Sequence, residues 1–378
     1  MVDARLANLR SILAARELDA FLSLKLVNTY FLSGFTSLDT VRPTSYTRPI
    51  AVIVSASGAV LIVPLLDEEA ADESSEIRDI RCYRNSPAPD AARALVREGL
   101  EEIGAKRIGI EQDTVTAEWL AFFARELPGV EVVPAGDAIQ ALRLRKDEAE
   151  IALMREAAKL ADIALRSSMA ASKPGTPELV AETDGVVALR QAAAAGGEQA
   201  FVDAIPMVLA GARSSMPHEF TTGRPIGEDE LMWHCWLVSY RGYWVENIRT
   251  GVAATSDRKH ADTFALLHES LIAGQEAAVP GATAGDVYRT VMNVLHSRTV
   301  PGGTVLNRAG HGMGLEYHEP PFVEDADETV LEPGVVLTVE PGIWVSGTGG
   351  YALSNTLVVR DGAAEQLIPT PTELFLTA

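Results

Sequence analysis

The stretch Gly310-His311-Gly312-Met313-Gly314-Leu315-Glu316-Tyr317-His318-Glu319 sets two histidines among glycines, and Val339-Glu340-Pro341-Gly342 later adds a carboxylate. The flanking glycines and the prolines that follow His318 favour functional roles for His311 and His318 over packing roles. Imidazole suits such roles because its ordinary pKa of about 6.5 lets it take and give a proton near neutrality. These two stretches therefore predict a polar site in the C-terminal half of the chain.

A third motif comes earlier, in residues 235–250, where Gly242-Tyr243 and Arg249-Thr250 lie close together. Taken with the first two, it resembles the pita-bread family of creatinases, prolidases, aminopeptidases P and methionine aminopeptidases. The resemblance covers nearly the whole chain. It implies an α/β N-terminal domain over residues 1–142 and an α+β C-terminal pita-bread domain over residues 143–378.

Local patterns agree with two domains of these types. Alternating strand and helix patterns predict an α/β layer in the N-terminal part, with helices near 3–17, 90–103 and 115–126 and strands near 19–24, 49–54, 60–64, 107–110 and 130–133. In the C-terminal part, a long helix that carries Ile151 and Met154 is stopped at Lys173-Pro174-Gly175. Two further helices are predicted over 177–194 and 260–278, and strands carrying the site come between and after them.

The metal-dependent members of this family hold two ions with two aspartates, one histidine and two glutamates. By resemblance, Cys235 and Glu246 occupy the aspartate positions, His311 the histidine position, Glu340 the first glutamate position and Ser354 the last. Two hard cations held close together need several bridging carboxylates. The cysteine and the serine therefore predict loss of the two-ion centre, and we expect no metal cofactor.

An alternative keeps one divalent ion such as zinc. Zinc accepts sulfur, nitrogen and oxygen ligands in a tetrahedron, so Cys235, Glu246, His311 and Glu340 could hold it. A lone cysteine on an apolar strand is, however, more often a small buried hydrophobic residue. In this alternative the protein is an Xaa-Pro peptidase or a dipeptidase-like enzyme.

His218, in Met216-Pro217-His218-Glu219, matches the catalytic histidine that both branches of the family keep. The nearest resemblance is to the metal-free creatinases and ectoine-hydrolase-like members. It implies a metal-independent hydrolase of a C–N bond in a small amidine, guanidine or cyclic amide, an amidinohydrolase in the case of the first two. His218 would shuttle protons, Glu246 and Glu340 would bind the cationic group, and His311 and His318 would complete the polar wall. A specialised biosynthetic enzyme and a non-catalytic pita-bread protein remain further alternatives.

Aromatic residues near the motifs predict a pocket for a flat or cationic ligand. Side chains alternate faces along a strand, so Trp233 shares a face with Cys235, and Trp244 with Glu246. Tryptophan faces attract cations. The resemblance also implies a homodimer in which the N-terminal domain of one subunit edges the pocket of the other, where arginines could hold a carboxylate bidentately. The predicted substrate contacts are Cys235, Trp233, Trp244, Tyr317, Arg249, Arg42 and Arg48.

Composition and charge argue against several classes of protein. The formal net charge of −20 argues against attraction to nucleic acid or anionic lipid. No apolar run approaches the roughly 18 residues that cross a bilayer, and the N-terminal pattern is an amphipathic helix rather than a signal peptide. Two cysteines, Cys82 and Cys235, imply no disulfide framework. We therefore expect a cytoplasmic enzyme that acts on a small molecule.

Overall fold

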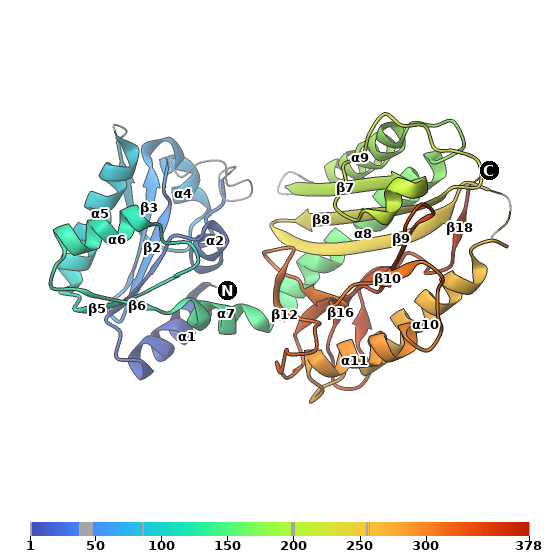
Figure 1. The fold of residues 1–378 in the computed structure, drawn as a ribbon. Coiled ribbons are helices and arrows are strands. Elements are labelled where there is room, and N and C mark those ends of the chain that lie inside the picture. The colour runs from blue at the N-terminus through green and yellow to red at the C-terminus, as the bar shows by residue number, and fades with distance from the viewer. Residues whose placement is uncertain are drawn as a thin grey trace. The chain divides into compact units, whose positions relative to one another are not determined.

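The computed structural model describes residues 2–37, 48–84, 87–197, 201–254, 256 and 258–377. The chain divides into two compact units, residues 1–143 and 144–378 (Figure 1). Within the described residues, no helix is both long enough and apolar enough to cross a membrane. Cytoplasmic localisation and a homodimer stay predictions.

The N-terminal unit is built on a six-stranded mixed sheet with the order β4-β3-β2-β1-β5-β6 in its described part. The strands β1, β2 and β3 pair antiparallel, whereas β4, β5 and β6 join the sheet in parallel pairs. A parallel pair needs a long crossover connection, and α4, α5 and α6 lie in these connections. The strands are Ala20–Ser23 (β1), Ala51–Ser55 (β2), Ala59–Pro64 (β3), Asp79–Tyr83 (β4), Arg107–Ile110 (β5) and Glu131–Pro134 (β6). The α-helices are Val2–Ala15 (α1), Leu26–Ser33 (α2), Glu68–Ser74 (α4), Ala88–Ile103 (α5), Ala117–Glu126 (α6) and Gly136–Leu144 (α7).

The C-terminal unit contains a sheet whose main path runs β12-β11-β13-β16-β9-β8-β7, and β17 and β18 extend it beside β16 and β9. A smaller sheet has the order β10-β14-β15. Its helices are Glu148–Ala171 (α8), Glu178–Ala194 (α9), Ala261–Ala277 (α10) and Ala284–Leu295 (α11). The main-sheet strands are Val202–Ala210 (β7), Leu231–Tyr240 (β8), Tyr243–Val252 (β9), His311–Gly312 (β11), Glu319–Phe322 (β12), Val336–Val339 (β13), Ser354–Val358 (β16), Glu365–Gln366 (β17) and Phe375–Leu376 (β18). The smaller sheet consists of Gly303–Val305 (β10), Gly342–Val345 (β14) and Gly349–Ala352 (β15).

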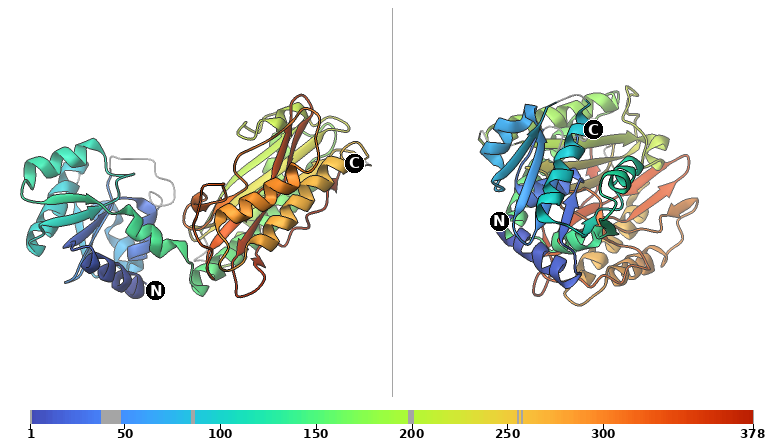
Figure 2. Two further views of the ribbon diagram at one scale, coloured as in Figure 1. Left: turned by 60° about the horizontal axis from the view of Figure 1, so that its bottom comes forward. Right: turned by 90° about the vertical axis from the view of Figure 1, so that its left-hand side faces the viewer.

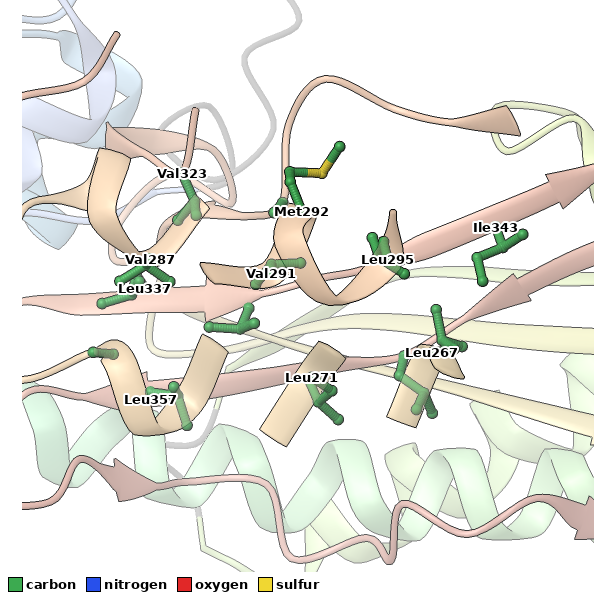
Figure 3. Close-up of a cluster of buried hydrophobic side chains, with 14 of the residues drawn as sticks. Leu267, Leu271, Val287, Val291, Met292, Leu295, Val323, Leu337, Ile343 and Leu357 are labelled. Atoms are coloured by element: carbon green, nitrogen blue, oxygen red, sulfur yellow. The ribbon is translucent and has the colours of Figure 1, made fainter. Parts of the chain in front are cut away.

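Helices cover one face of the main sheet in two groups. The helix α8 packs against β8 and β9, and α9 packs against α8 and β7. Figure 2 shows α10 and α11 lying side by side along the sheet. Their buried side chains, such as Leu271 and Val291, meet Leu337 of β13 and Leu357 of β16 in one apolar cluster (Figure 3).

Strand alternation divides the residues of β8 and β9 between two environments. His234 and Asn247 face α8, where His234 contacts the hydroxyls of Ser168 and Ser172, and the side-chain amide of Asn247 donates toward Ala161 O. Their neighbours Cys235 and Glu246 therefore face the opposite side of the sheet. That side carries the candidate site.

The predicted fold class is confirmed in both units. The predicted helices near 151–172, 177–194 and 260–278 correspond to α8, α9 and α10. A capping box in which Asp147 and Glu150 satisfy each other's backbone N–H groups begins α8. The helices α2, α4, α7 and α11 were not predicted.

Candidate active site

Three neighbouring strands place Cys235, Glu246 and Ser354 on one face. In the ladder between β8 and β9, Cys235 pairs with Ile248, and in the ladder between β9 and β16, Ser354 pairs with the same Ile248. Glu246 lies two residues before Ile248 and so shares its face. The sheet register thus brings together three positions that are far apart in the sequence.

Glu246 is buried, and two residues of β16 form hydrogen bonds with it. The hydroxyl of Ser354 donates to Glu246 Oε1 at 2.5 Å, and the backbone N–H of Glu246 donates to Thr356 Oγ1 at 2.9 Å. Burial alone would raise the pKa of Glu246, but its interactions with His311 and with the Ser354 hydroxyl outweigh burial and lower it. Glu246 is therefore an ionised carboxylate with its Oε2 directed toward His311.

His311 supplies the central nitrogen of the site. Its Nδ1 donates to the carbonyl oxygen of Gly312 at 3.1 Å, because a carbonyl can only accept. In the neutral ring, Nε2 then carries a lone pair, and it lies 3.7 Å from Glu246 Oε2 and 3.6 Å from Glu340 Oε2. Among the described residues, this buried nitrogen has no hydrogen-bond partner. Burial disfavours charge on the ring, but Glu246 and Glu340 outweigh it and raise the pKa of His311.

The glycines around His311 are required by close backbone approach. Gly310 has a φ of 146°, and a Cβ there would lie 2.1 Å from the carbonyl oxygen of Thr338. At Gly312, a Cβ would lie 2.3 Å from the carbonyl oxygen of Pro320. Real Cβ atoms do not approach so closely, so the motif fixes His311 between β12 and β13.

His318 lies directly beside His311, with the two ring centroids 4.0 Å apart. Ligand atoms of Glu246, His311 and His318 all lie within 4.8 Å of one another. Partial burial, followed by the nearby His311 and Arg308 side chains, lowers the pKa of His318 to about 4. A neutral imidazole is the form that binds a metal ion.

Glu340 follows β13 and borders this trio. Its backbone N–H donates to Ala309 O at 2.8 Å. Burial and then the charge of Glu246 raise the pKa of its carboxyl to about 8. The side chain nevertheless keeps 33 % of its surface accessible.

Cys235 lies near the carboxylates but outside the trio. Burial, and then the charges of Glu246 and Glu340, raise the pKa of its thiol well above the usual value. The compact group that the structure forms contains His318, which the sequence assigned to the polar wall, in place of Cys235.

Of the other predicted contacts, Trp244, Tyr317 and His218 lead to the site, whereas the indole of Trp233 bonds to the backbone. A chain of ring contacts leads to the site: Trp244 lies 5.6 Å from Tyr317, and Tyr317 lies 5.1 Å from His318, between centroids. His218 is exposed and close enough to His318 to lower the pKa of that ring. Trp233, by contrast, donates its indole N–H to Ser214 O at 2.7 Å and is buried.

The structure corrects the assignment of Arg249 as a substrate contact. This fully buried guanidinium uses all five N–H groups on acceptors within the fold, and strand alternation places it on the face of β9 opposite Glu246. The acceptors are the carbonyl oxygens of Ile248, Ser354, Thr370 and Pro371 and Oδ1 of Asn355. Arg42 lies outside the described residues, and Arg48 belongs to the N-terminal unit.

Two charged features of the site were not predicted. Arg308 lies over the ring of Phe322 and pairs with Glu324 at 3.0 Å, and its charge lowers the pKa values of Glu340 and His318. Lys146 and Glu319 form a buried ion pair at 2.8 Å. Their closeness in sequence to the two histidines could have pointed to them, because Arg308 precedes His311 by three residues and Glu319 directly follows His318.

Comparison with known protein families shows to which family the chain belongs. Residues 152–361 match metallopeptidase family M24, and residues 5–145 match the creatinase/prolidase N-terminal domain. The chain belongs to metallopeptidase family M24. This M24 chain is 26 % identical over 376 residues to an Xaa-Pro dipeptidase of Pyrococcus furiosus, which covers 98 % of this chain and 99 % of the relative. It is 27 % identical over 364 residues to an Xaa-Pro dipeptidase of Pyrococcus horikoshii, covering 95 % of each.

Solved M24 structures share the fold over the whole chain. The Xaa-Pro dipeptidase from Bacillus anthracis superposes with a TM-score of 0.86 at 23 % identity and covers 100 % of both chains. The prolidase from Pyrococcus furiosus superposes with a TM-score of 0.80 at 25 % identity and covers 96 % of this chain and 99 % of the other.

These findings correct three predictions. The nearest relatives were predicted to be metal-free creatinases, but the two relatives described above are Xaa-Pro dipeptidases. The prediction of a metal-independent amidinohydrolase is therefore wrong. The prediction of no metal cofactor is also wrong, because the family is one of metallopeptidases and this chain keeps Glu246, His311 and His318 within ligand distance of one another.

The residues of this M24 site fit one divalent ion rather than two. An unpartnered buried nitrogen on His311, a second imidazole on His318 and the carboxylate of Glu246 form a donor set that zinc-like ions accept. The place for a second ion lacks the bridging carboxylates that a pair of hard cations needs, since Ser354 offers a hydroxyl already bonded to Glu246 and Cys235 offers a thiol. The replacements at Cys235 and Ser354 therefore argue against a second ion but not against a single one.

Proposed function

We propose that this M24 protein hydrolyses peptide bonds in small peptides of the Xaa-Pro type, using one divalent ion. Glu246, His311 and His318 would hold the ion, and Glu340 would border it. The observation that carries the proposal is the buried Nε2 of His311, which has no hydrogen-bond partner in the described part of the chain and lies between two carboxylates and beside a second imidazole. Residues 143–378 are the proposed catalytic domain, and residues 1–142 the N-terminal domain.

A divalent ion bound there supplies Lewis acidity, which polarises a carbonyl and makes water a stronger acid. The chain orients the ligands. The hydroxyl of Ser354 fixes one oxygen of Glu246 and leaves the other directed at His311, and the Gly312 carbonyl fixes the tautomer of His311. Partners of this kind set ring orientation and ligand basicity in metal sites.

Two groups are placed to move protons. Glu340 is partly accessible and lies 3.6 Å from His311 Nε2, and a bound cation would favour its ionised form, in which it could receive the proton of an attacking water. His218 is exposed near His318 and can give a proton to the leaving amine nitrogen. A prolyl nitrogen becomes a secondary amine when its peptide bond breaks, so it needs a proton to leave.

The aromatic wall supports proline as the substrate's second residue. Trp244 and Tyr317 stand edge to face, and Tyr317 is 40 % exposed beside His318. Aromatic-lined grooves are a recurring way of binding proline rings. Both curated relatives described above are named for this specificity.

The test combines metal content with a dipeptide pair. Protein purified without chelator should contain close to one ion per chain by elemental mass spectrometry, and should cleave Ala-Pro faster than Ala-Ala. The Glu246→Gln variant should lose both metal and activity, because it removes the charged ligand. Cleavage of neither dipeptide across a series of added divalent metals would overturn the proposed activity, and two ions per chain would overturn the single-ion site.

A further inference from the structure

The segment that presents His218 is anchored at both of its ends. At one end, the 3-10 helix Gly211–Ser215 (η2) is fixed through Ser214, whose hydroxyl accepts the N–H of Gly350 at 2.9 Å and whose carbonyl accepts the indole N–H of Trp233. At the other end, Thr221 Oγ1 accepts the N–H of Val208 at 2.9 Å. Between these anchors, residues 216–220 form an exposed turn that carries His218.

One guanidinium crosses this turn. Arg213 Nη2 donates to Glu219 Oε2 at 2.9 Å and to Phe220 O at 2.8 Å, on the residues that directly follow His218. Its Nη1 donates to Thr222 Oγ1 at 2.9 Å and to Glu178 Oε2 at 2.9 Å. Only a planar fork reaches acceptors on two sides in this way. Arg213, which lies in η2 before the turn, therefore links η2 to the residues that follow His218.

Glu178 fixes the position of Arg213. Its side chain has no exposed surface, and it lies in the first turn of α9, where the helix dipole favours a carboxylate. It also accepts the N–H of Ala210 at 3.1 Å and both the N–H and the hydroxyl of Thr222 at 3.2 Å. A buried carboxylate with this many donors has one stable orientation. The position of Arg213 is thus set by the body of the domain rather than by the exposed turn.

We propose that Arg213, fixed by Glu178, is a positioning residue that holds the turn in the conformation presenting His218 to the site. The catalytic part of this inference rests on the proposed role of His218 in peptide cleavage. His218 itself sits on an exposed turn, so its orientation depends on the backbone that carries it. A displacement of about 1 Å can cost about 10²-fold in rate, which is why such a turn benefits from a rigid brace.

The first measurement is independent of activity. Phe220 is 82 % exposed, and chymotrypsin cleaves after such a residue when the backbone around it is mobile. Because Arg213 binds the carbonyl oxygen of Phe220, the wild-type protein should resist cleavage there. Arg213→Gln should be cleaved at least about tenfold faster if the turn opens freely. Unchanged cleavage would overturn the brace.

The second measurement is a kinetic cycle with His218→Ala. Arg213→Gln should lower kcat by about 10- to 100-fold, with metal content and KM little changed. In the His218→Ala background the same substitution should change kcat by less than about twofold, because the residue that it positions is gone. Equal losses in both backgrounds would show that Arg213 acts elsewhere and would overturn the positioning role.

Two further variants guard against a general loss of structure. Arg213→Lys keeps a cation beside Glu178 but cannot span the turn, so it should fold and still show faster cleavage after Phe220. Arg224→Gln is the matched control, because Arg224 approaches Glu178 at 4.0 Å and pairs with Glu230 but makes no side-chain hydrogen bond to residues 219 or 220. It should leave both kcat and cleavage after Phe220 unchanged, and a loss equal to that of Arg213→Gln would overturn the proposal. If the wild-type protein cleaves no peptide, the proposed function fails, and the proteolysis result alone decides the brace.

Discussion

Ser354 donates its hydroxyl proton to Oε1 of Glu246, on the face of the sheet where the metal-dependent pattern places a further carboxylate. A hydroxyl in this position satisfies one oxygen of Glu246 without adding negative charge. The remaining oxygen points to His311. This single relationship changes the charge of the site and, with it, the number of cations that the site can balance.

Restoring the missing carboxylates should restore a second ion. We expect the double variant Cys235→Asp, Ser354→Glu to contain close to two ions per chain where the wild type contains close to one. Both positions share a face with Glu246, and bridging carboxylates are what a pair of hard cations requires. Elemental mass spectrometry on desalted protein measures the ratio.

A variant that adds no ligand serves as the control for that experiment. Ser354→Ala removes the hydrogen bond to Glu246 without adding a ligand, so the ion count should stay near one. A folded double variant that still binds one ion would show that the second place is closed by shape rather than by lack of charge.

Gly310→Ala should destabilise the C-terminal unit strongly. The added Cβ would meet the carbonyl oxygen of Thr338 at 2.1 Å on a backbone with a φ of 146°, so the β11 and β13 strands must separate. We expect a loss of about 2 to 4 kcal/mol in the free energy of unfolding. Gly129→Ala is the control, since nothing lies within 4 Å of its Cβ position, and it should change stability by less than about 0.5 kcal/mol. Denaturant unfolding compares the two, and equal effects would refute the close-contact argument.

His234 should make the protein acid-sensitive. Complete burial lowers its pKa to about 3, against an ordinary value near 6.5, so below about pH 6.5 the unfolded chain takes up a proton that the folded chain refuses. Its contribution is therefore full above about pH 6.5 and is lost progressively as the pH falls toward about 3. Between about pH 7 and about pH 5 the cost is about 2 kcal/mol.

The matched variant is His234→Gln, whose neutral amide can still bond to Ser168 and Ser172 but does not titrate. Unfolding free energies at the two pH values, measured for both proteins, isolate the contribution of His234 because all other groups are shared. The same pH dependence in both proteins would contradict the assignment.

The motif resemblance named several positions that the structure brings close together. Cys235, Glu246, His311 and Glu340 were all identified by motif, and the structure brings Glu246, His311 and Glu340 within reach of one another. The role of Arg249 was beyond such reasoning. Its five acceptors come from strands β9 and β16 and from the segment after β17, and no local pattern shows that all five N–H groups are already used.

The sequence also could not show how His318 comes to lie beside Glu246 and His311, the other proposed metal ligands. Whether its imidazole reaches Glu246 and His311 depends on the path of residues 313–319, and that path depends on a buried ion pair between Glu319 and Lys146, which are 173 residues apart. The position of His318 in the proposed ligand set thus involves a long-range contact. A motif read alone assigns His311 but leaves His318 open.

Replacing one partner of that ion pair should destabilise the protein strongly, whereas replacing both partners with neutral residues should cost much less. Lys146 and Glu319 are 2 % and 4 % exposed, and the other oxygen of Glu319 accepts the N–H of Glu316 at 3.2 Å. Lys146→Met removes the cation that pairs with this buried carboxylate, so we expect a loss of about 3 to 5 kcal/mol in the free energy of unfolding. Adding Glu319→Gln removes the carboxylate charge as well, and the double variant should recover much of that loss because a neutral amide still accepts from Glu316.

The same cycle separates folding from metal binding. Since residues 316–319 carry His318 to the site, Lys146→Met should also weaken metal affinity, while the double variant should recover stability more fully than affinity. Unfolding by denaturant in the presence of chelator, set beside a competitive metal titration, measures the two quantities separately. Additive losses in the double variant would mean that Lys146 and Glu319 act independently, and the path of the His318 segment would then have another cause.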